Sequence, residues 1–318
     1  MTRNHCLFAL AGLILLLLVP FVFTDSYTRH VFIVAFIYAT VAANWDLSLG
    51  IGGLFNFGHL AFFGIGVYTA AMLTSHLDLS PWLAILAGGA TAAGAGLLIS
   101  LPVARLKGIY VVLVTFAFGQ LCMQIVLSQG DLTGGAEGLV RLPYLKLGDY
   151  NFIRDFKFAY YYVALGLLTL SVIALLFIAR SPFGLSLRAV RDNPEYAQSR
   201  GISVARQRVL VMVVSAVFTG IAGGLYAIYF RVASPEVFGF SLGTLILSMV
   251  LIGGAGSILG PVFAALALTF LTEAMAGVRG LEEARFIIVA VAMILVLRLV
   301  PSGAIDIFSR LTRAGRNS

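Results

Sequence analysis

The sequence predicts an all-α polytopic membrane protein with about ten transmembrane helices. Composition is the first reason, because the 318 residues are 60% hydrophobic and only 11% charged, with a mean hydropathy of +1.00. A soluble domain carries about 25% charged residues, so lipid must cover much of this surface. The second reason is that the apolar runs are long and do not alternate, which favours helices over a β-barrel. The placement of Lys and Arg is the third reason.

The expected spans are apolar runs close to the ~20 residues that cross a bilayer. In chain order they cover residues 7–23, 31–49, 57–75, 82–103, 109–128, 158–179, 208–229, 240–254, 258–275 and 285–300. The first run follows Arg3 but lacks a small-residue cleavage pattern. We therefore expect an uncleaved first helix rather than a signal peptide.

The basic residues give these spans an orientation. With the N-terminus in the cytoplasm, the inner segments carry 13 of the 21 Lys and Arg residues. This excess agrees with the positive-inside rule. Ten spans then place both termini in the cytoplasm. A long loop at 129–157 lies outside, and a second long loop at 180–207 and the tail at 301–318 lie inside.

Several classes of function are not supported by the sequence. No GxSxG, HExxH or phosphate-binding GxxxxGK[ST] pattern occurs, so we expect neither enzyme activity nor a cofactor on this chain. The four histidines, at positions 5, 30, 59 and 76, lack ligand spacing, and no metal site is predicted. The net charge of +7 does not indicate nucleic acid, because the basic residues gather at membrane edges. Cys6 and Cys122 lie in apolar segments and are expected to be small buried hydrophobes.

Two glycine-rich stretches, Gly50–His59 and Gly253–Pro261, predict helices that break. Glycine relaxes the backbone and proline removes a donor. Irregular backbone at membrane depth is tolerated where it lines a cavity or is buried in protein. Because the two stretches lie in opposite halves, the chain is compatible with two inverted five-helix halves, which is a transporter design. Close helix packing through small residues is the alternative interpretation.

A polar, Arg-rich segment separates the span ending at 179 from the span beginning at 208. Within it, Asn193-Pro194 predicts a turn into a short helix. Glu195 then lies in the first turn, where a carboxylate suits the helix dipole, and Gly201 can end the helix. Such a helix would lie along the membrane face and fit a groove of a partner protein. A basic loop held by anionic lipid is the alternative.

Four blocks of the sequence, in the same order, resemble the LivM-like permeases of branched-chain amino-acid ABC importers. They are Trp45–Ala70, Leu132–Pro143, Ser181–Tyr226 and Gly253–Pro261. The third block holds Glu195, Ala197 and Gly201 in a spacing close to the E-A-A-x-x-x-G pattern of the loop that docks onto the ATPase. Each block alone is modest evidence, but the four together are specific.

The resemblance implies a single transmembrane permease domain over residues 1–318, in the bacterial cytoplasmic membrane. It implies that ATP acts on two separate ABC ATPase subunits, and that a second related permease and an extracytoplasmic binding protein are further partners. Branched-chain amino acids are the substrate that the family suggests. Urea, short amides, aromatic acids and other amino acids are alternatives.

The resemblance and the residue chemistry together give three sets of candidate site residues. The ATPase-coupling loop contains Arg188, Arg191, Glu195, Ala197 and Gly201. The substrate path contains Asn56, Gly58, His59, Tyr68, Gly253, Gly254 and Gly256, with Thr115, Gln120 and Ser257 as further polar candidates. The extracytoplasmic segment contains Thr133, Gly134, Gly135 and Gly138. Two residues depart from the family pattern: Tyr196 stands where a small residue is usual, and Asn56 where Ser or Thr is common.

Asp46, near the inner end of the second expected span, supports a competing hypothesis. An ionisable group inside a membrane segment is a functional candidate. An ion-coupled secondary transporter could use Asp46 or Glu273 as a proton site. A capping role for Asp46 is the simpler explanation, and the ion-coupled hypothesis gives the Arg-rich loop no role.

Overall fold

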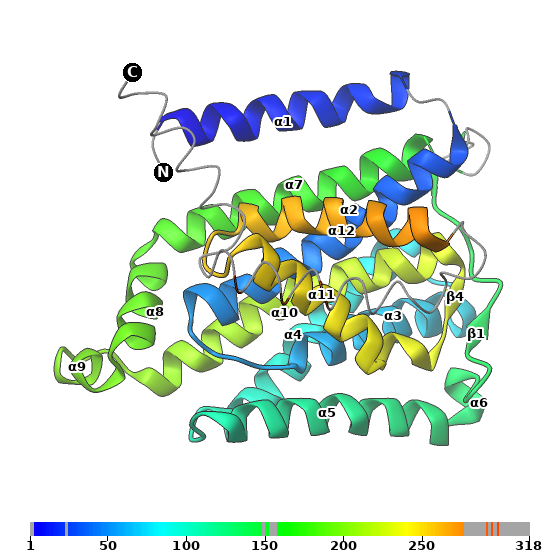
Figure 1. Ribbon diagram of the computed structural model, residues 1–318. Coiled ribbons are helices and arrows are strands. Elements are labelled where there is room, and N and C mark those ends of the chain that lie inside the picture. Colours follow the sequence, from blue (N-terminus) through cyan, green and yellow to red (C-terminus); the bar gives the residue numbers. More distant parts are fainter. Residues whose placement is uncertain are drawn as a thin grey trace.

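The computed structural model describes residues 3–22, 25–147, 150–152 and 158–276, together with residues 291, 294 and 298 (Figure 1). The longer helices are α1 (Arg3–Val22), α2 (Ser26–Asp46), α3 (Gly58–His76), α4 (Pro81–Val103), α5 (Ile109–Ser128), α7 (Phe158–Arg180), α8 (Pro182–Asp192), α10 (Val204–Phe230), α11 (Phe240–Gly253) and α12 (Leu259–Ala276). The shorter helical elements are the π-helix η1 (Leu47–Ile51), α6 (Gly130–Thr133), α9 (Pro194–Ser199) and the 3₁₀ helix η2 (Pro235–Phe238). The strands are β1 (Leu139–Val140), β2 (Lys146–Leu147), β3 (Tyr150–Asn151) and β4 (Val232–Ala233).

Nine of the ten expected spans correspond to a helix of this structure. The second expected span is α2 continued by η1, and the others match one helix each. Five described helices are long and apolar enough to cross a membrane, namely α2 with η1, α4, α5, α7 and α10, while α11 and α12 are shorter apolar helices. The tenth expected span, 285–300, lies outside the described residues apart from three positions, and so does the tail, 301–318. The chain is therefore a multi-pass helical membrane protein.

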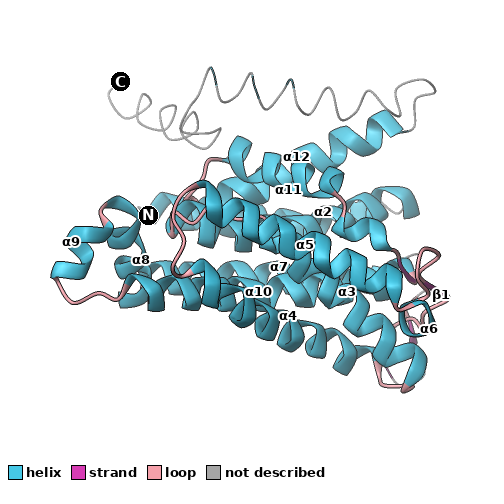
Figure 2. Ribbon diagram, turned by 90° about the horizontal axis from the view of Figure 1, so that it is seen from below, coloured by secondary structure: helices cyan, strands magenta, loops and turns pink. Residues whose placement is uncertain are grey.

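α2 runs through the middle of the bundle, and α5 lies on its rim (Figures 1 and 2). In an 18-residue apolar window, 89% of the α2–η1 positions are buried, compared with 22% in α5. Helices α7, α10, α11 and α12 all contact α2. At its start, the Asp25 carboxylate accepts a hydrogen bond from the backbone N–H of Thr28 at 3.1 Å, and this bond holds the pKa of Asp25 below its usual value.

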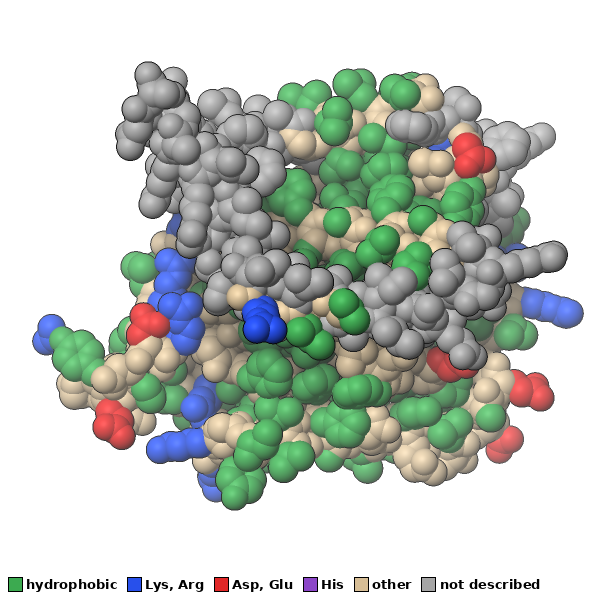
Figure 3. Space-filling view, viewed as in Figure 1, with side chains coloured by type: hydrophobic (Ala, Val, Ile, Leu, Met, Phe, Trp, Pro, Cys, Tyr) green, Lys and Arg blue, Asp and Glu red, His purple; other side chains and the backbone are tan. Residues whose placement is uncertain are grey.

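The two ends of the bundle differ in structure and charge. α8 and α9 project from one end, and α6, β1 and β4 form the other (Figures 1 and 2). Figure 3 shows hydrophobic side chains over the middle of the molecule and Lys and Arg gathered mainly toward the end with α8 and α9. The loops and helix termini at that end carry Arg105, Lys107, Arg180, Arg188, Arg191, Arg200, Arg206 and Arg208. We call this the basic end.

Glycines let α3, α4 and α10 pack with their backbones in contact. A Cβ atom added at Gly66 would overlap the backbone of Gly220, and one added at Gly220 would overlap the Gly88 carbonyl. The three helices therefore approach at small residues, which is the packing mode of many membrane helices. This contact joins the three helices without room for side chains between them.

We expect Gly220→Ala to destabilise the protein, because its new methyl group has no room. Overpacking a tight interface costs about 1–3 kcal/mol. Gly94→Ala, also within the bundle helices, is the matched control, since nothing lies within 4 Å of a Cβ atom there. The measurement is thermal unfolding of the detergent-solubilised protein by intrinsic fluorescence. A Gly220→Ala protein as stable as Gly94→Ala would contradict the tight contact.

Candidate functional site at the meeting of two helix breaks

The first break follows α2. The helix widens into the π-helix η1, and the chain then leaves helical geometry until Gly58 starts α3. We call residues 47–57 the first break. Gly53 has φ = +63°, a left-handed conformation that favours glycine. π-helical segments occur often at functional sites, because the extra residue redirects the backbone.

The second break joins α11 to α12 and covers residues 254–258. Gly254 and Gly256 have φ of +97° and +90°, and Ile258 has φ = +58°. A positive φ at a β-branched residue such as Ile258 is strained. Ser257 organises the turn, since its hydroxyl donates to the Gly254 carbonyl at 2.7 Å and accepts from the Gly260 N–H at 3.1 Å.

The Asp46 carboxylate joins the two breaks, although they are more than 200 residues apart in the sequence. Its Oδ1 accepts from the Gly256 N–H at 2.6 Å, and its Oδ2 accepts from the Ile258 N–H at 2.8 Å. Asp46 is fully buried. Both oxygens therefore satisfy backbone donors of the second break, just before α12 begins, where the helix dipole favours a negative charge. Asp46 has a structural role, but its bonds are to the opposite half of the chain and not local as expected from the sequence.

Glycine is required where the breaks touch. A Cβ atom at Gly50 would overlap the backbone of Gly256 and the Asp46 carboxylate. One at Gly253 would overlap Gly260 and Pro261. We call Asp46, Gly50, Gly256 and Ile258 together the break junction. Of the glycines expected on the substrate path, Gly253, Gly254 and Gly256 lie in or next to it.

Asn56 holds the polypeptide of the first break in shape. Its Nδ2 donates to Ser48 Oγ at 3.1 Å and to the Leu54 carbonyl at 3.0 Å, and its Oδ1 accepts from the Gly58 N–H at 3.2 Å. His59 Nδ1 lies 3.1 Å from the same oxygen. Asn56 and His59 are both buried, so their side chains support the backbone of the first break from within the protein interior.

Trp45 and His59 form the second part of this polar network. The rings stack with centroids 5.3 Å apart, and Trp45 Nε1 donates to the Asn56 carbonyl at 2.8 Å. His59 Nε2 is buried and has no hydrogen-bond partner among the described residues. At Phe57, the last residue of the first break, the backbone N–H donates to the Thr115 hydroxyl of α5 at 3.0 Å. Thr115 thus connects the first break to α5.

Tyr68 lies away from the breaks, toward the other end of α3. Its hydroxyl donates to the Ala233 carbonyl at 3.3 Å, and its ring stacks on Phe238. The structure therefore does not bring Tyr68 together with Asn56 and the second break. It places Tyr68 beside the expected extracytoplasmic segment.

That segment forms a compact turn joined to the chain after α10. Gly134, Gly135 and Gly138 all have positive φ. The Thr133 hydroxyl donates to the Val126 carbonyl at 2.6 Å and accepts from the Gly135 N–H at 3.2 Å. A Cβ atom at Gly138 would overlap the Ala233 carbonyl, because β1 pairs antiparallel with β4 at this point. The T-G-G-x-x-G pattern is thus explained by backbone conformation and close packing.

The Arg-rich loop folds as the sequence predicts into a short helix from Pro194 that ends before Gly201. The Asn193 side chain accepts from the Tyr196 N–H at 2.9 Å and caps α9. Gly201 has φ = +82°. Glu195 and Tyr196 are exposed. The helix predicted from the sequence is confirmed, and these two side chains are free to meet a partner.

Ala197 faces the protein interior, unlike the exposed Glu195 of the same helix. It is buried in a small apolar cluster with Val190 of α8 and Val204 of α10. A larger side chain at this position would separate the three helices. Ala197 therefore packs α9 against α8 and the start of α10.

Two features of the site gave no clear signal in the sequence. Arg191 turns inward, and its Nη1 donates to the Gly50 carbonyl of the first break at 2.8 Å. Arg208 donates to the Ala104 and Leu106 carbonyls, which joins the start of α10 to the loop between α4 and α5. Both acceptors are backbone atoms, so no partner side chain marks these contacts in the sequence.

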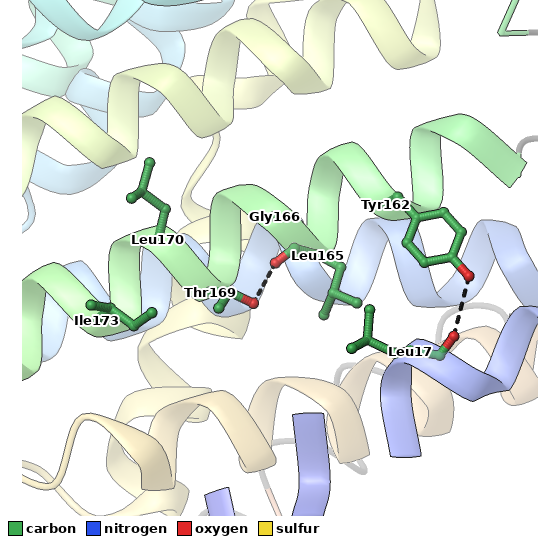
Figure 4. Close-up of a pocket in the computed structure, with 7 residues that line it drawn as sticks. All are labelled: Leu17, Tyr162, Leu165, Gly166, Thr169, Leu170 and Ile173. Carbon is green, nitrogen blue, oxygen red and sulfur yellow. Dashed lines mark hydrogen bonds between the residues drawn. The ribbon is translucent and has the colours of Figure 1, made fainter. Parts of the chain in front are cut away.

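An apolar groove of about 350 Å³ separates α1 from α7 (Figure 4). Pro20 lacks an N–H, which leaves the Leu16 carbonyl of α1 without its helical donor. The Tyr161 hydroxyl donates to this carbonyl at 2.6 Å, and Tyr162 donates to the Leu17 carbonyl at 3.2 Å. These bonds attach α1 to the bundle. The described residues that line the groove include no charged side chain, and none of them belongs to the breaks.

The described residues form no cluster of three His, Cys, Asp or Glu side chains that could hold a metal ion. A multi-pass bundle with two apposed helix breaks and a helical loop at its basic end has the architecture of a membrane permease. Residues 27–297 match the family described as the permease component of branched-chain amino acid transport systems, and the chain belongs to this family. The family resemblance inferred from the four sequence blocks is thereby confirmed.

Individual relatives agree with this assignment. The chain is 30% identical to the high-affinity branched-chain amino acid transport system permease protein LivM of Escherichia coli K12, over 95% of this chain and 75% of the relative. It is 27% identical to LivH of the same strain, over 84% of this chain and 90% of the relative. The guanosine ABC transporter permease NupQ of Bacillus subtilis is 25% identical over 55% of this chain and 59% of the relative. No solved structure matches the chain.

We expect Asp46→Ala to destabilise the protein strongly, because two buried N–H groups lose their acceptors. Each unsatisfied group costs about 1–3 kcal/mol. Asp46→Asn keeps one acceptor oxygen and should fall between this variant and the wild type. The measurement is thermal unfolding in detergent, with the exposed Asp131→Ala as the control. If Asp46→Ala unfolded at the wild-type temperature, the Asp46 bonds would not hold the break junction.

Proposed function

We propose that this chain is the permease subunit of an ATP-driven ABC importer of branched-chain amino acids in the bacterial cytoplasmic membrane. The observation that carries the proposal is the exposed α9 helix at the basic end of a bundle that belongs to the branched-chain permease family. Such a helix gives an ATPase on another chain a surface to move. ATP would bind and be hydrolysed there, with no cofactor on this chain.

The charge distribution supports an orientation for the bundle. The basic end would face the cytoplasm, in accord with the positive-inside rule. The opposite end carries both signs of charge, with Asp78, Asp131, Glu137 and Glu236 alongside Arg141, Lys146 and Arg231. Ten spans would then put both termini in the cytoplasm, with residues 285–300 as the last span. Two inverted five-helix halves would explain why the first and second breaks, one in each half, meet at Asp46.

The coupling surface in this proposal is the outer side of α8 and α9. Glu195 and Tyr196 are exposed there, and the Arg200 guanidinium lies 5.7 Å from the centre of the Tyr196 ring. Arg188 and Gly201 flank this surface. Tyr196, where a small residue is usual, would enlarge the part of α9 that enters the ATPase.

The other partners follow from the proposal. Two ATPase subunits would serve a pair of permeases, this chain and a second related one. A binding protein would deliver substrate to the end that carries α6, β1 and β4, where Thr133–Gly138 forms a firm surface turn. The substrate path would pass the break junction. Asn56, Gly58 and His59 would shape it by holding the first break, and Tyr68 would support its outer end.

Branched-chain amino acids are favoured over other substrates by the extent of the similarity. The match to LivM covers 95% of this chain, whereas the match to the guanosine permease NupQ covers 55%. At the first break, Phe57 lies against Phe55, Phe116 and Phe240, and a substrate that passes there would meet an apolar surface. This cluster suits an aliphatic side chain better than a ribose with its hydroxyls.

The test is a mild-detergent pull-down of the tagged protein from its native membranes, followed by mass spectrometry. We expect an ATPase and a second permease to be recovered with the wild type. Glu195→Arg should lose the ATPase, because the reversed charge lies on the proposed contact and removes a carboxylate from the first turn of α9. Asp131→Arg, a matched charge reversal at the opposite end, should retain it.

Recovery of the wild-type protein without any ATPase, under conditions that keep other ABC complexes intact, would count against an importer. It would favour ion-coupled transport, with uptake that survives ATP depletion. Both Asp46 oxygens are occupied by backbone donors, which speaks against Asp46 as the proton site in that case. Screening the recovered binding protein with leucine, isoleucine, valine and guanosine would then test the substrate.

A further inference from the structure

Arg191 connects the Arg-rich loop to the first break. It is the second-last residue of α8, and its Nη1 donates to the Gly50 carbonyl in the π-helix η1 at 2.8 Å. The other side of the guanidinium bonds Asp192, with both Nε and Nη2 at 2.9 Å from Oδ1. The Arg191 side chain is 39% exposed, so it is oriented by these contacts and not by deep burial.

The Gly50 carbonyl is a natural acceptor for this cation. It lies in the last turn of α2 and η1, where carbonyl groups have lost their helical donors and the dipole favours a positive charge. A guanidinium presents several N–H donors in a fixed plane, so one group can hold Gly50 and Asp192 together. Arg191 is thus a cap for the C-terminal end of the helix that carries Asp46.

The contact extends to the second break. An ideal Cβ atom on Gly256 would be 3.3 Å from the Gly50 carbonyl oxygen and 3.7 Å from Arg191 Nη1. The stem of Arg191 packs against Gly53, where an added Cβ atom would overlap its Cγ. Arg191 therefore lies against both breaks at the break junction, and three glycines leave the room for it.

Packing contacts connect α9 to the end of α8 that carries Arg191. Ala197 of α9 is packed with Val190 of α8, the residue before Arg191. At the other end of α8, Gly184 lies so close to the Ile178 and Ala179 carbonyls of α7 that a side chain would overlap them. α8 is thus held at a close elbow with α7, and a displacement of α9 would swing its Arg191 end.

We infer that Arg191 is a positioning residue that transmits movement of α8 and α9 to the break junction, and so links ATP hydrolysis to opening of the substrate path. This inference rests on the proposed importer function. The alternative is that Arg191 only stabilises the fold. A stabilising residue would affect assembly, hydrolysis and transport together, whereas a transmitting residue would separate hydrolysis from transport.

The test uses the complete importer, purified with its ATPases and second permease and reconstituted in liposomes. The variants are Arg191→Ala and Arg191→Lys, and the control is Arg206→Ala, which removes an exposed arginine near the start of α10. ATP hydrolysis and uptake of radiolabelled leucine are measured on the same vesicles. The quantity compared is the uptake per ATP hydrolysed.

We expect Arg191→Ala to lower the uptake per ATP at least about tenfold, since it removes a hydrogen bond from a charged donor. ATP hydrolysis should stay near the wild-type rate. Arg191→Lys, which can still donate to Gly50 but cannot also hold Asp192 in the same plane, should be intermediate. Arg206→Ala should match the wild type. Unchanged uptake per ATP in Arg191→Ala, or a parallel loss of hydrolysis and uptake, would overturn the inference.

A second measurement covers the case in which Arg191→Ala does not assemble. Hydrogen–deuterium exchange of residues 47–57 is compared in the complex with and without ATP plus orthovanadate. We expect a nucleotide-dependent change in the wild type that is reduced in Arg191→Lys, and equal changes would contradict transmission through Arg191. A wild-type complex that contains no ATPase would instead be a failure of the proposed function, so the two outcomes are distinguishable.

Discussion

The structure depends on one buried carboxylate that joins two helix breaks from opposite halves of the chain. Asp46 accepts two backbone N–H groups at the start of α12, at 2.6 and 2.8 Å. In the membrane, water cannot replace those bonds, and a charge without partners is expensive. The strained φ at Ile258 occurs at the residue whose N–H donates to Asp46. Asp46 thus joins the end of α2 to the second break, while Asn56 and Ser257 hold the backbone within the first and second breaks.

Other features of the bundle accommodate this arrangement. The breaks touch at Gly50 and Gly256, where the close contact leaves no room for a side chain on Gly50. Hydrogen bonds within the first break involve the side chains of Asn56, Ser48 and Trp45. Its non-helical backbone therefore has hydrogen-bond partners inside the protein. The close packing of α3, α4 and α10 provides a fixed support.

The same geometry gives the proposed importer a means of coupling. The exposed side of α9 is available to a partner, while its buried side, through Ala197 and Val190, is joined to α8. α8 ends at Arg191, which contacts the carbonyl end of the helix bearing Asp46. A short series of contacts therefore leads from the basic end of the bundle to the junction of the breaks. These contacts give the Arg-rich loop a role in coupling, and an ion-coupled carrier would need no such loop.

The sequence by itself determined the helical membrane class, nine helix positions and the short α9 helix, because apolar length, basic residues and turn chemistry are local signals. It also marked both breaks, since glycine and proline act on their own backbone. Only the tertiary structure decided that the breaks meet, that Asp46 caps the opposite half, that Ala197 faces inward and that Tyr68 lies apart from Asn56. Asp46 and Tyr68 form hydrogen bonds with backbone N–H and C=O groups far away in the sequence. Nearly every residue carries such groups, so no side-chain pattern in the sequence identifies the partner. Ala197 faces inward because it packs against Val190 and Val204, which depends on how three helices meet.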